Sequence, residues 1–287
     1  MTADGEPDYV NKGQKLQSAG GDRFEVGRKL GGGKFGQVFE AKYEKKNGEV
    51  KGIVALKLIK FDEEDDSEVR NELNILKIVQ NVERVVTPKK AFDVELNSEI
   101  YKIIVFERLG PSLEFLIQNR TLNVQNCVKI GYILLEIFED LQKLGIHYKD
   151  LHSGNVLFSS DLRIMKLTDF GLSQRAKRSS KNDPKEYKYA FDASSIMFLM
   201  VCLRTDCKFI TKCECSTSDY LNELNGLRDT LLDSNMVFLM TFLNEMIAQL
   251  KGELSYSKLR LSLTSELATF DPNSCFILTP TVPVWLA

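Results

Sequence analysis

The alternation of apolar and polar positions divides the chain into a strand-rich first part and a helical second part. Short apolar runs separated by glycine or Asn-Gly turns are typical of strands joined by tight turns. These runs predict strands over residues 24–30, 37–43, 53–59 and 100–106.

Apolar residues spaced three and four apart predict helices in the rest of the chain. Helices are expected to begin near Ser67, Ser112 and Asn123, and further helices over 220–232, 236–249 and 256–266. Residues 196–203 are eight consecutive apolar residues with no polar face, which predicts a central, buried helix. We therefore expect a mixed α+β fold with a β-rich first lobe and a larger, mostly helical second lobe.

The predicted lobes meet where the strand over residues 100–106 stops at Gly110-Pro111. Residues 1–22 are mostly polar without periodicity and are expected to form a flexible leader. The first lobe is expected to span 23–108, the second 109–270, and a proline-containing extended tail 271–287.

The overall composition excludes several classes of protein. With 43% apolar residues the 287-residue chain can bury a sizeable core, and its net charge of −2 provides no global field for nucleic acid. No apolar run approaches the length of a membrane span, and no secretory signal is visible at the start. The six cysteines are irregularly spaced, which favours reduced thiols in a cytoplasmic or nuclear protein over a zinc site at Cys207, Cys213 and Cys215.

A polar loop and the hairpin after it carry the main candidate chemistry. The helix before the loop ends at Gly145, and the predicted hairpin over 156–167 separates Asp150 and Asn155 from Asp169. This layout can bring the three side chains together. Phosphoryl transfer needs such a set, in which one carboxylate orients the attacking hydroxyl while an amide and a second carboxylate hold Mg²⁺.

A second candidate is the glycine-rich turn, in which Gly31, Gly33 and Gly36 fit the pattern G-x-G-x-x-G. In dinucleotide-binding proteins this pattern opens a helix. Here Val38 and Phe39 follow, so a hairpin that covers phosphates fits better than a strand-to-helix turn.

Lys57 is a cation inside an apolar run, and by itself it fits an outward-pointing strand lysine as well as a phosphate-binding one. Glu72 lies on or beside the apolar stripe of the helix that begins near Ser67. Because a buried unpaired carboxylate is costly, we expect Glu72 to pair with Lys57, and a solvated Glu72 is the less favoured alternative.

A basic loop over residues 175–181 follows Asp169. It is interpreted as solvated surface, with a dock for acidic or phosphorylated peptides as the alternative.

In the order of these motifs the sequence resembles the eukaryotic protein kinases over residues 30–267. The nearest branch is the casein kinase 1 group, which includes the vaccinia-related kinases. Three stretches are similar to that branch: residues 109–114, Asp192 at the entry to the buried helix, and residues 242–244 followed by 256–260.

The resemblance implies a bilobal kinase that uses ATP and Mg²⁺, with its site in a cleft between unequal lobes. Catalytic roles fall on Asp150, on Lys57 braced by Glu72, and on His152, while Asn155 and Asp169 are the implied metal ligands. The implied nucleotide-binding residues are Leu30, Gly31, Gly32, Gly33, Lys34, Phe35, Gly36, Val38, Ala55, Lys57, Phe106, Glu107, Leu109 and Leu157.

The chain departs from the family pattern at three places. Tyr148-Lys149-Asp150 replaces the family's usual His-Arg-Asp, which keeps a basic residue and the aspartate. His152 stands where serine/threonine kinases usually carry a lysine that contacts the γ-phosphate, although the haspin branch looks similar at this point. Only 192 − 171 = 21 positions separate Gly171 from Asp192, and Ala-Pro-Glu is missing, with Asp183-Pro184-Lys185-Glu186 at best a remnant. The resemblance therefore supports nucleotide binding better than peptide phosphorylation.

These observations favour a serine/threonine protein kinase, and the alternative interpretation of the basic loop indicates an acidic or already phosphorylated protein substrate. The alternative is a pseudokinase or scaffold that binds nucleotide or a partner protein. A small-molecule kinase is a third, less favoured interpretation.

Overall fold

The computed structural model describes residues 7–33, 36–60, 67–176, 185–204, 217–250, 254–276 and 278–280. The chain forms two compact units. Unit 1 contains residues 1–81 and 85–109, and unit 2 contains residues 82–84 and 110–287. Unit 1 is rich in strands and unit 2 is mostly helical, as the apolar pattern predicts.

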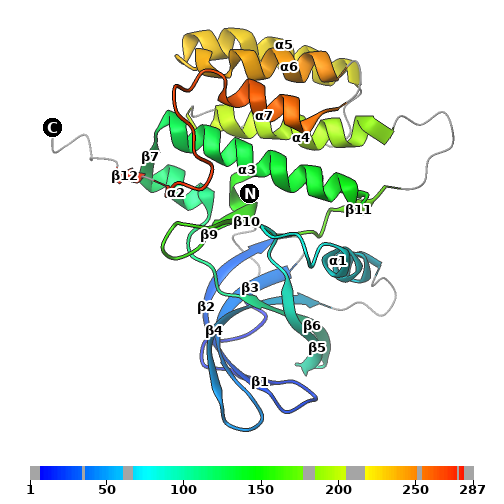
Figure 1. The fold of residues 1–287 in the computed structure, drawn as a ribbon. Helices are drawn as coiled ribbons and strands as arrows, with labels where there is room; N and C mark the ends of the chain where they lie inside the picture. Colours follow the sequence, from blue (N-terminus) through cyan, green and yellow to red (C-terminus); the bar gives the residue numbers. More distant parts are fainter. Residues whose placement is uncertain are drawn as a thin grey trace. The chain divides into compact units, whose positions relative to one another are not determined.

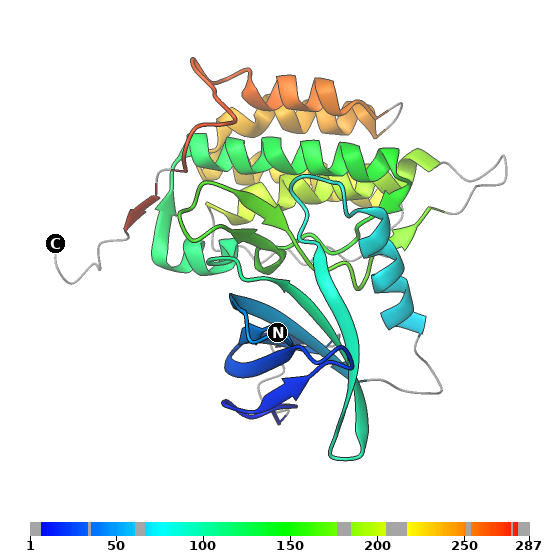
Figure 2. The same cartoon turned by 60° about the horizontal axis from the view of Figure 1, so that its bottom comes forward.

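Unit 1 is built on a six-stranded antiparallel sheet with the strand order β1-β2-β3-β4-β6-β5 (Figure 1). The long β5–β6 hairpin protrudes from this sheet (Figure 2). The elements of unit 1 are β1 (Lys15–Gln17), β2 (Arg23–Gly33), β3 (Gly36–Glu44), β4 (Val50–Lys60), α1 (Ser67–Ile78), β5 (Pro88–Leu96) and β6 (Glu99–Glu107).

The two faces of the sheet follow from the alternation of side chains along each strand. One face carries the main core of unit 1, in which Phe24 stacks on Tyr43 with ring centroids 4.8 Å apart. On the other face, Val69 of α1 packs against Ile59 and Ile104. The helix is thereby fixed to the sheet through its apolar stripe.

The expected flexible leader over residues 1–22 is wrong for the part that the structure describes. β1 pairs with β2, with Leu16 opposite Phe24, and Val10 and Leu16 are 2% and 1% exposed. These two apolar residues stand among polar ones and show no periodicity, so their burial depends on a partner strand. The strand β5 was also not predicted, because only Phe92 among its nine residues is buried.

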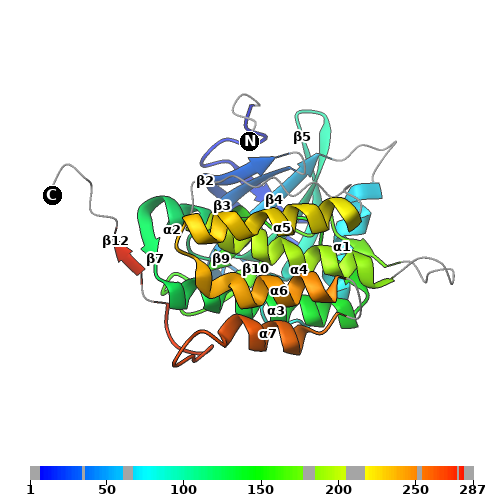
Figure 3. The same cartoon turned by 90° about the horizontal axis from the view of Figure 1, so that it is seen from above.

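In unit 2, α4 and α7 pack against α3, and α6 packs against α4, α5 and α7 (Figure 3). The described part of this unit also has three short antiparallel strand pairs, β9–β10, β8–β11 and β7–β12. Its helices are α2 (Leu113–Asn119), α3 (Val124–Lys143), α4 (Lys185–Cys202), α5 (Thr217–Asp233), α6 (Met240–Gln249) and α7 (Tyr256–Thr264), with 3₁₀ turns η1 (Ser153–Asn155) and η2 (Val237–Leu239). Its strands are β7 (Arg120–Leu122), β8 (Ile146–His147), β9 (Val156–Phe158), β10 (Met165–Leu167), β11 (Gln174–Arg175) and β12 (Leu278–Pro280). No described helix has the length and apolar character needed to cross a membrane.

The ends and the packing of α3 explain how the candidate site is placed. Asn123 caps the helix by accepting a hydrogen bond from the N–H of Asn126 at 2.7 Å, and Gly145 leaves it with a φ of +71°. Gly131 allows α4 to approach, because a Cβ at this position would lie 2.5 Å from the sulfur of Met200. The predicted buried helix is confirmed: its residues 196–203 lie in α4 and just after it, and Met200 is fully buried.

The predicted extended tail from residue 271 packs onto unit 2 as far as it is described. The ring of Phe276 lies 5.0 Å from that of Phe158, and the Lys129 ammonium lies 4.4 Å from the centroid of the Phe276 ring. β12 then pairs with β7. Residues 271–276 and 278–280 are therefore part of the fold of unit 2.

Candidate active site

The glycine-rich pattern forms the hairpin between β2 and β3, as predicted, and Gly33 pairs with Gly36 at its end. Gly36 has a φ of +115°, and a Cβ there would lie 2.3 Å from the carbonyl oxygen of Leu58. Only glycine fits such a position without displacing the β4 backbone. Lys34 and Phe35 lie outside the described residues.

Lys57 and Glu72 form the predicted ion pair. The Lys57 ammonium donates to both carboxylate oxygens of Glu72, at 2.7 and 2.9 Å. Lys57 is 6% exposed and Glu72 is 3% exposed, so both charges are almost entirely removed from water. Two short, charge-assisted hydrogen bonds offset that desolvation and hold the lysine in one place.

The sheet face around Lys57 carries small apolar side chains. Val38 of β3 lies directly opposite Lys57 in the register, so both side chains point to the same face. Ala55 is two residues before Lys57 on β4 and shares this face. Both apolar residues are half-buried, as is Leu30 of β2. Val38 and Ala55 thus place apolar side chains on the same sheet face as the fixed Lys57 ammonium group.

Three of the implied nucleotide-binding residues lie at the end of β6 or just after it. Phe106 is half-buried, pairs with Ala55 and packs beside the cluster formed by α1 and the sheet. Glu107 ends the strand, and Leu109, the last residue of unit 1, is 9% exposed.

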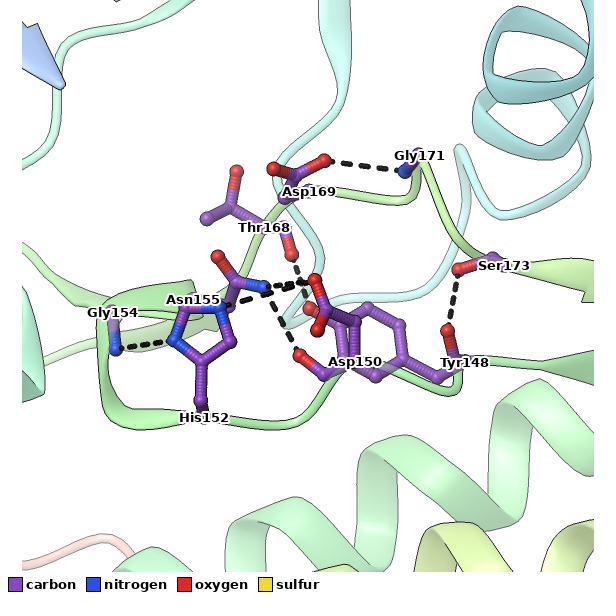
Figure 4. A network of polar contacts seen from close by, with 9 residues as sticks. All are labelled: Tyr148, Asp150, His152, Gly154, Asn155, Thr168, Asp169, Gly171 and Ser173. Carbon is purple, nitrogen blue, oxygen red and sulfur yellow. Dashed lines mark hydrogen bonds and ion pairs between the residues drawn. The ribbon is translucent and has the colours of Figure 1, made fainter. Parts of the chain in front are cut away.

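In unit 2 a network of hydrogen bonds links the predicted loop residues (Figure 4). The Asn155 amide nitrogen donates to the Asp150 backbone carbonyl at 3.0 Å and to its carboxylate at 3.2 Å. This leaves the amide oxygen of Asn155 pointing away from Asp150 in Figure 4. The Asp150 side chain remains 30% exposed.

The β9–β10 hairpin brings Asp169 to Asn155. Val156 pairs with Leu167, and beyond this pair the N–H of Thr168 donates to the carbonyl of Asn155 at 3.0 Å. Asp169 has a φ of +57° and its carboxylate accepts from the N–H of Gly171 at 3.2 Å. The structure thus gathers Asp150, Asn155 and Asp169 within unit 2.

Asn155 and Asp169 present amide and carboxylate oxygens, the donors that Mg²⁺ prefers. Within the described parts of the chain, no group of three or more His, Cys, Asp or Glu side chains is arranged to hold a metal ion. Mg²⁺ is usually bound by one or two protein ligands together with phosphate oxygens and water. The two side chains fit that pattern.

His152 is held beside Asp150. Its Nδ1 accepts a hydrogen bond from the N–H of Gly154 at 3.1 Å, and its Nε2 lies 3.9 Å from a carboxylate oxygen of Asp150. Because Nδ1 is an acceptor, a neutral ring carries its proton on Nε2, toward Asp150. The side chain is 56% exposed and remains accessible to a ligand.

Asp192 of α4 supports the loop through hydrogen bonds to its backbone. Its carboxylate accepts hydrogen bonds from the backbone N–H groups of Tyr148 and Lys149 at 2.8 and 2.9 Å, and His147 Nε2 lies 3.4 Å away. Burial raises the pKa of Asp192 to about 7, although the two N–H groups act in the opposite direction. The sequence showed Asp192 as an acidic residue entering an apolar helix but did not reveal this supporting role.

Tyr148 completes the support of the loop. It is fully buried, and its hydroxyl donates to the carbonyl of Thr168 at 2.6 Å, while its own carbonyl accepts from the Ser173 hydroxyl at 3.1 Å. Burial raises the pKa of Tyr148 well above 10, so the hydroxyl keeps its proton and its role as a donor. The loop before Asp150 is thereby tied to the segment that carries Asp169.

Several predicted features fall at the edge of the described chain or beyond it. Leu157 is half-buried in β9 and forms a bridge with Ser112. Of the basic loop over residues 175–181, only Arg175 and Ala176 are described. Cys207, Cys213, Cys215 and residues 183–184 lie outside the described residues, as does the end of the tail from residue 281.

Comparison with known proteins gives one family model, described as a protein kinase domain, which matches residues 24–196. The chain is 28% identical over 163 residues to Misshapen-like kinase 1 of Rattus norvegicus and 27% identical over 153 residues to calcium-dependent protein kinase 25 of Arabidopsis thaliana. It is 27% identical over 174 residues to casein kinase I homolog 1 of Saccharomyces cerevisiae. These matches cover 54%, 52% and 58% of this chain and 12%, 29% and 29% of the relatives' lengths, respectively. Relatives from several kinase branches match about equally, so none of the branches is singled out.

Proposed function

The chain belongs to the protein kinase family, and from this we propose that it transfers the γ-phosphate of ATP to a serine or threonine of a protein substrate. The observation that carries the proposal is the gathering of Asp150, Asn155 and Asp169 by the loop and the β9–β10 hairpin. The buried pair of Lys57 and Glu72 supports it independently from unit 1.

In the proposed reaction Asp150 accepts the proton of the substrate hydroxyl. The hydroxyl oxygen forms a bond to the γ-phosphorus while the bond from that phosphorus to the β–γ bridging oxygen breaks, so that ADP leaves. The hydrogen bond from Asn155 keeps the carboxylate of Asp150 in one orientation. The exposure of Asp150 leaves room for the hydroxyl.

Asn155 and Asp169 would hold Mg²⁺, which neutralises charge on the phosphate oxygens when it is bound. In unit 1, Lys57 would contact the α- and β-phosphates, and the surface formed by Leu30, Val38 and Ala55 would contact the adenine together with Leu157, Phe106, Glu107 and Leu109. The glycine hairpin would cover the phosphates with backbone N–H groups. His152 would donate from Nε2 to the γ-phosphate in place of the usual lysine.

We assign the chain to the casein kinase 1 group on the basis of residues 109–114, Asp192 and the paired stretches 242–244 and 256–260. An acidic or phosphorylated protein substrate is proposed from the basic residues 175–181, and a cytoplasmic or nuclear location from the irregular cysteine spacing.

A second candidate function is that of a kinase-fold scaffold that binds nucleotide or a partner protein without efficient transfer. The observation that favours it is the interval of 21 positions between Gly171 and Asp192 without Ala-Pro-Glu. This segment usually forms the platform for a peptide substrate.

The test is phosphate transfer from radiolabelled ATP to casein by the wild-type chain and by Asp150→Asn. Removing a positioned general base is expected to lower the rate by about 10²–10⁴-fold. Asp161→Asn is the matched control, because Asp161 lies in the same unit on the exposed turn between β9 and β10 and is expected to transfer at the wild-type rate. Equal rates for wild type and Asp150→Asn would refute the kinase proposal. A melting temperature that rises with Mg-ATP in the absence of transfer would instead support the scaffold.

A further inference from the structure

A glutamine of the glycine hairpin is buried on the core face of the sheet. Gln37 directly follows Gly36 and is 3% exposed. It lies two residues before Phe39 on β3, so both side chains point to the same face, and Phe39 belongs to the main core of unit 1. A polar amide at such a position is stable only if its donor and acceptor are satisfied.

Both ends of this amide are bound by the chain near its beginning. The Gln37 side-chain oxygen accepts from the N–H of Tyr9 at 2.9 Å, and the side-chain nitrogen donates to the carbonyl of Pro7 at 3.0 Å. The partners are 28 and 30 residues away in sequence. The two bonds fasten residues 7–9 to the first residues of β3.

Residues 7–10, here called the N-terminal strap, have further contacts within unit 1. Val10 is buried in the core, and the ring of Tyr9 lies 5.1 Å from that of Tyr101. The carboxylate of Asp8 pairs with the ammonium of Lys29 at 2.8 Å, on the other strand of the glycine hairpin. The strap therefore touches both strands of that hairpin and is itself anchored in the core.

Two glycines in the described part of the hairpin tip have open space around the Cβ position. Gly31 and Gly33 are exposed, and a Cβ added at either residue would have no atom within 4 Å. Glycines also lose more conformational freedom than other residues when they are fixed. Gln37, which directly follows Gly36, can therefore determine the position of the hairpin.

We propose that the N-terminal strap holds the glycine hairpin in the position that binds Mg-ATP, and that Gln37 is the positioning residue through which it acts. The inference rests on the proposed function for its nucleotide part. Gln37 contacts no phosphate in this scheme, because its side chain lies on the core face of β3 and Val38 lies on the opposite face.

The first experiment compares Gln37→Met with the wild type. Methionine keeps the approximate volume of the side chain and removes both hydrogen bonds. Gln14→Met is the matched control, because the Gln14 side chain accepts only a local hydrogen bond from the N–H of Asn11, at 3.0 Å. Hydrogen exchange of the backbone amides of residues 31–38 and the dissociation constant for Mg-ATP are measured for each protein, with the melting temperature as a check on folding.

For Gln37→Met we expect exchange in the hairpin to rise about tenfold and the Mg-ATP dissociation constant to rise about three- to tenfold, the size expected from two lost hydrogen bonds. The KM for ATP should rise while kcat for casein changes less than about twofold, because no group that touches the reacting atoms is altered. Gln14→Met should match the wild type in every measurement.

A chain that lacks residues 1–9 but retains Val10 is a second way to remove both hydrogen bonds of the Gln37 amide. It should show the same faster exchange, and Gln37→Met in this shortened chain should add nothing, because the partners of the amide are already gone. Unchanged exchange in Gln37→Met, or effects of the two changes that simply add, would overturn the inference. A wild-type chain that binds no Mg-ATP would instead overturn the proposed function, and the exchange data would still decide whether the strap positions the hairpin.

Discussion

Replacing Glu72 by leucine is the sharpest test of the buried ion pair. The change leaves the Lys57 ammonium, 6% exposed, without the carboxylate that lies 2.7 Å away. Breaking one side of a buried pair typically costs about 3–5 kcal/mol, because the remaining charge stays desolvated. We expect the free energy of unfolding of unit 1 to fall by about this amount.

The double variant Lys57→Met with Glu72→Leu should behave differently. Both charges are then gone and apolar side chains of similar volume replace them, a change that is often neutral or stabilising. We expect its unfolding free energy to lie within about 1 kcal/mol of the wild type, so the two substitutions should be strongly non-additive. Neither this variant nor Glu72→Leu should bind Mg-ATP with wild-type affinity.

The assay is urea unfolding followed by circular dichroism, with Mg-ATP binding measured by calorimetry on the same samples. Glu99→Leu is the control, because Glu99 pairs with Lys60 at 3.0 Å with side chains 47% and 51% exposed. An exposed pair of this kind contributes about 0–1 kcal/mol. If Glu72→Leu costs no more than Glu99→Leu, the burial argument is wrong. If the double variant binds Mg-ATP as the wild type does, Lys57 is not a phosphate ligand.

Three other predictions follow from single positions. Gly36→Ala should weaken Mg-ATP binding at least about tenfold, as measured by calorimetry. The positive φ of this residue alone costs a non-glycine residue about 1–2 kcal/mol, and the new Cβ would meet the carbonyl of Leu58. Wild-type affinity would show that the hairpin does not need this conformation. Asp192 has a pKa raised from 3.8 to about 7. Between these pH values the folded state keeps a proton that the unfolded state has lost. The free energy of unfolding should therefore fall with rising pH in this range, by up to about 1.4 kcal/mol per pH unit. Urea unfolding at several pH values should show this slope for the wild type relative to Asp192→Asn, and parallel curves would count against it. Iodoacetamide at pH 8 should label exposed Cys275 in the folded chain and leave Cys127 unmodified, because burial raises the pKa of Cys127 to about 11. Mass spectrometry of the peptides measures the labelling, and modification of Cys127 in the folded chain would contradict this prediction.

Much of the candidate site could be predicted because its signals are local. Glycines at fixed spacing followed by Val38 and Phe39 indicate a hairpin, and Glu72 on an apolar stripe requires a cation such as Lys57. The polar loop after Gly145 and the hairpin after it likewise place Asn155 near Asp169. Each of these inferences needs only neighbouring residues or one expected ion pair.

The remaining contacts depend on partners that are far away in the sequence. Asp192 binds the N–H of Tyr148 across 44 residues, and Gln37 binds the N–H of Tyr9 across 28. Neither pairing can be predicted from the sequence pattern, because every residue except proline has a backbone N–H, and that group does not identify its acceptor.

The sequence by itself determined the strands β2, β3, β4 and β6, the helices that follow them, the glycine hairpin, the pairing of Lys57 with Glu72 and the set of polar residues in the loop. Periodicity and the cost of a buried charge suffice for these features because they act over short stretches. Only the tertiary structure decided that residues 15–17 join the sheet, that Val10 enters its core, that the described residues after 270 pack onto unit 2 and that Asp192 supports the loop. In these segments the burial of a few apolar or polar groups is favourable only when a distant part of the chain supplies the other surface.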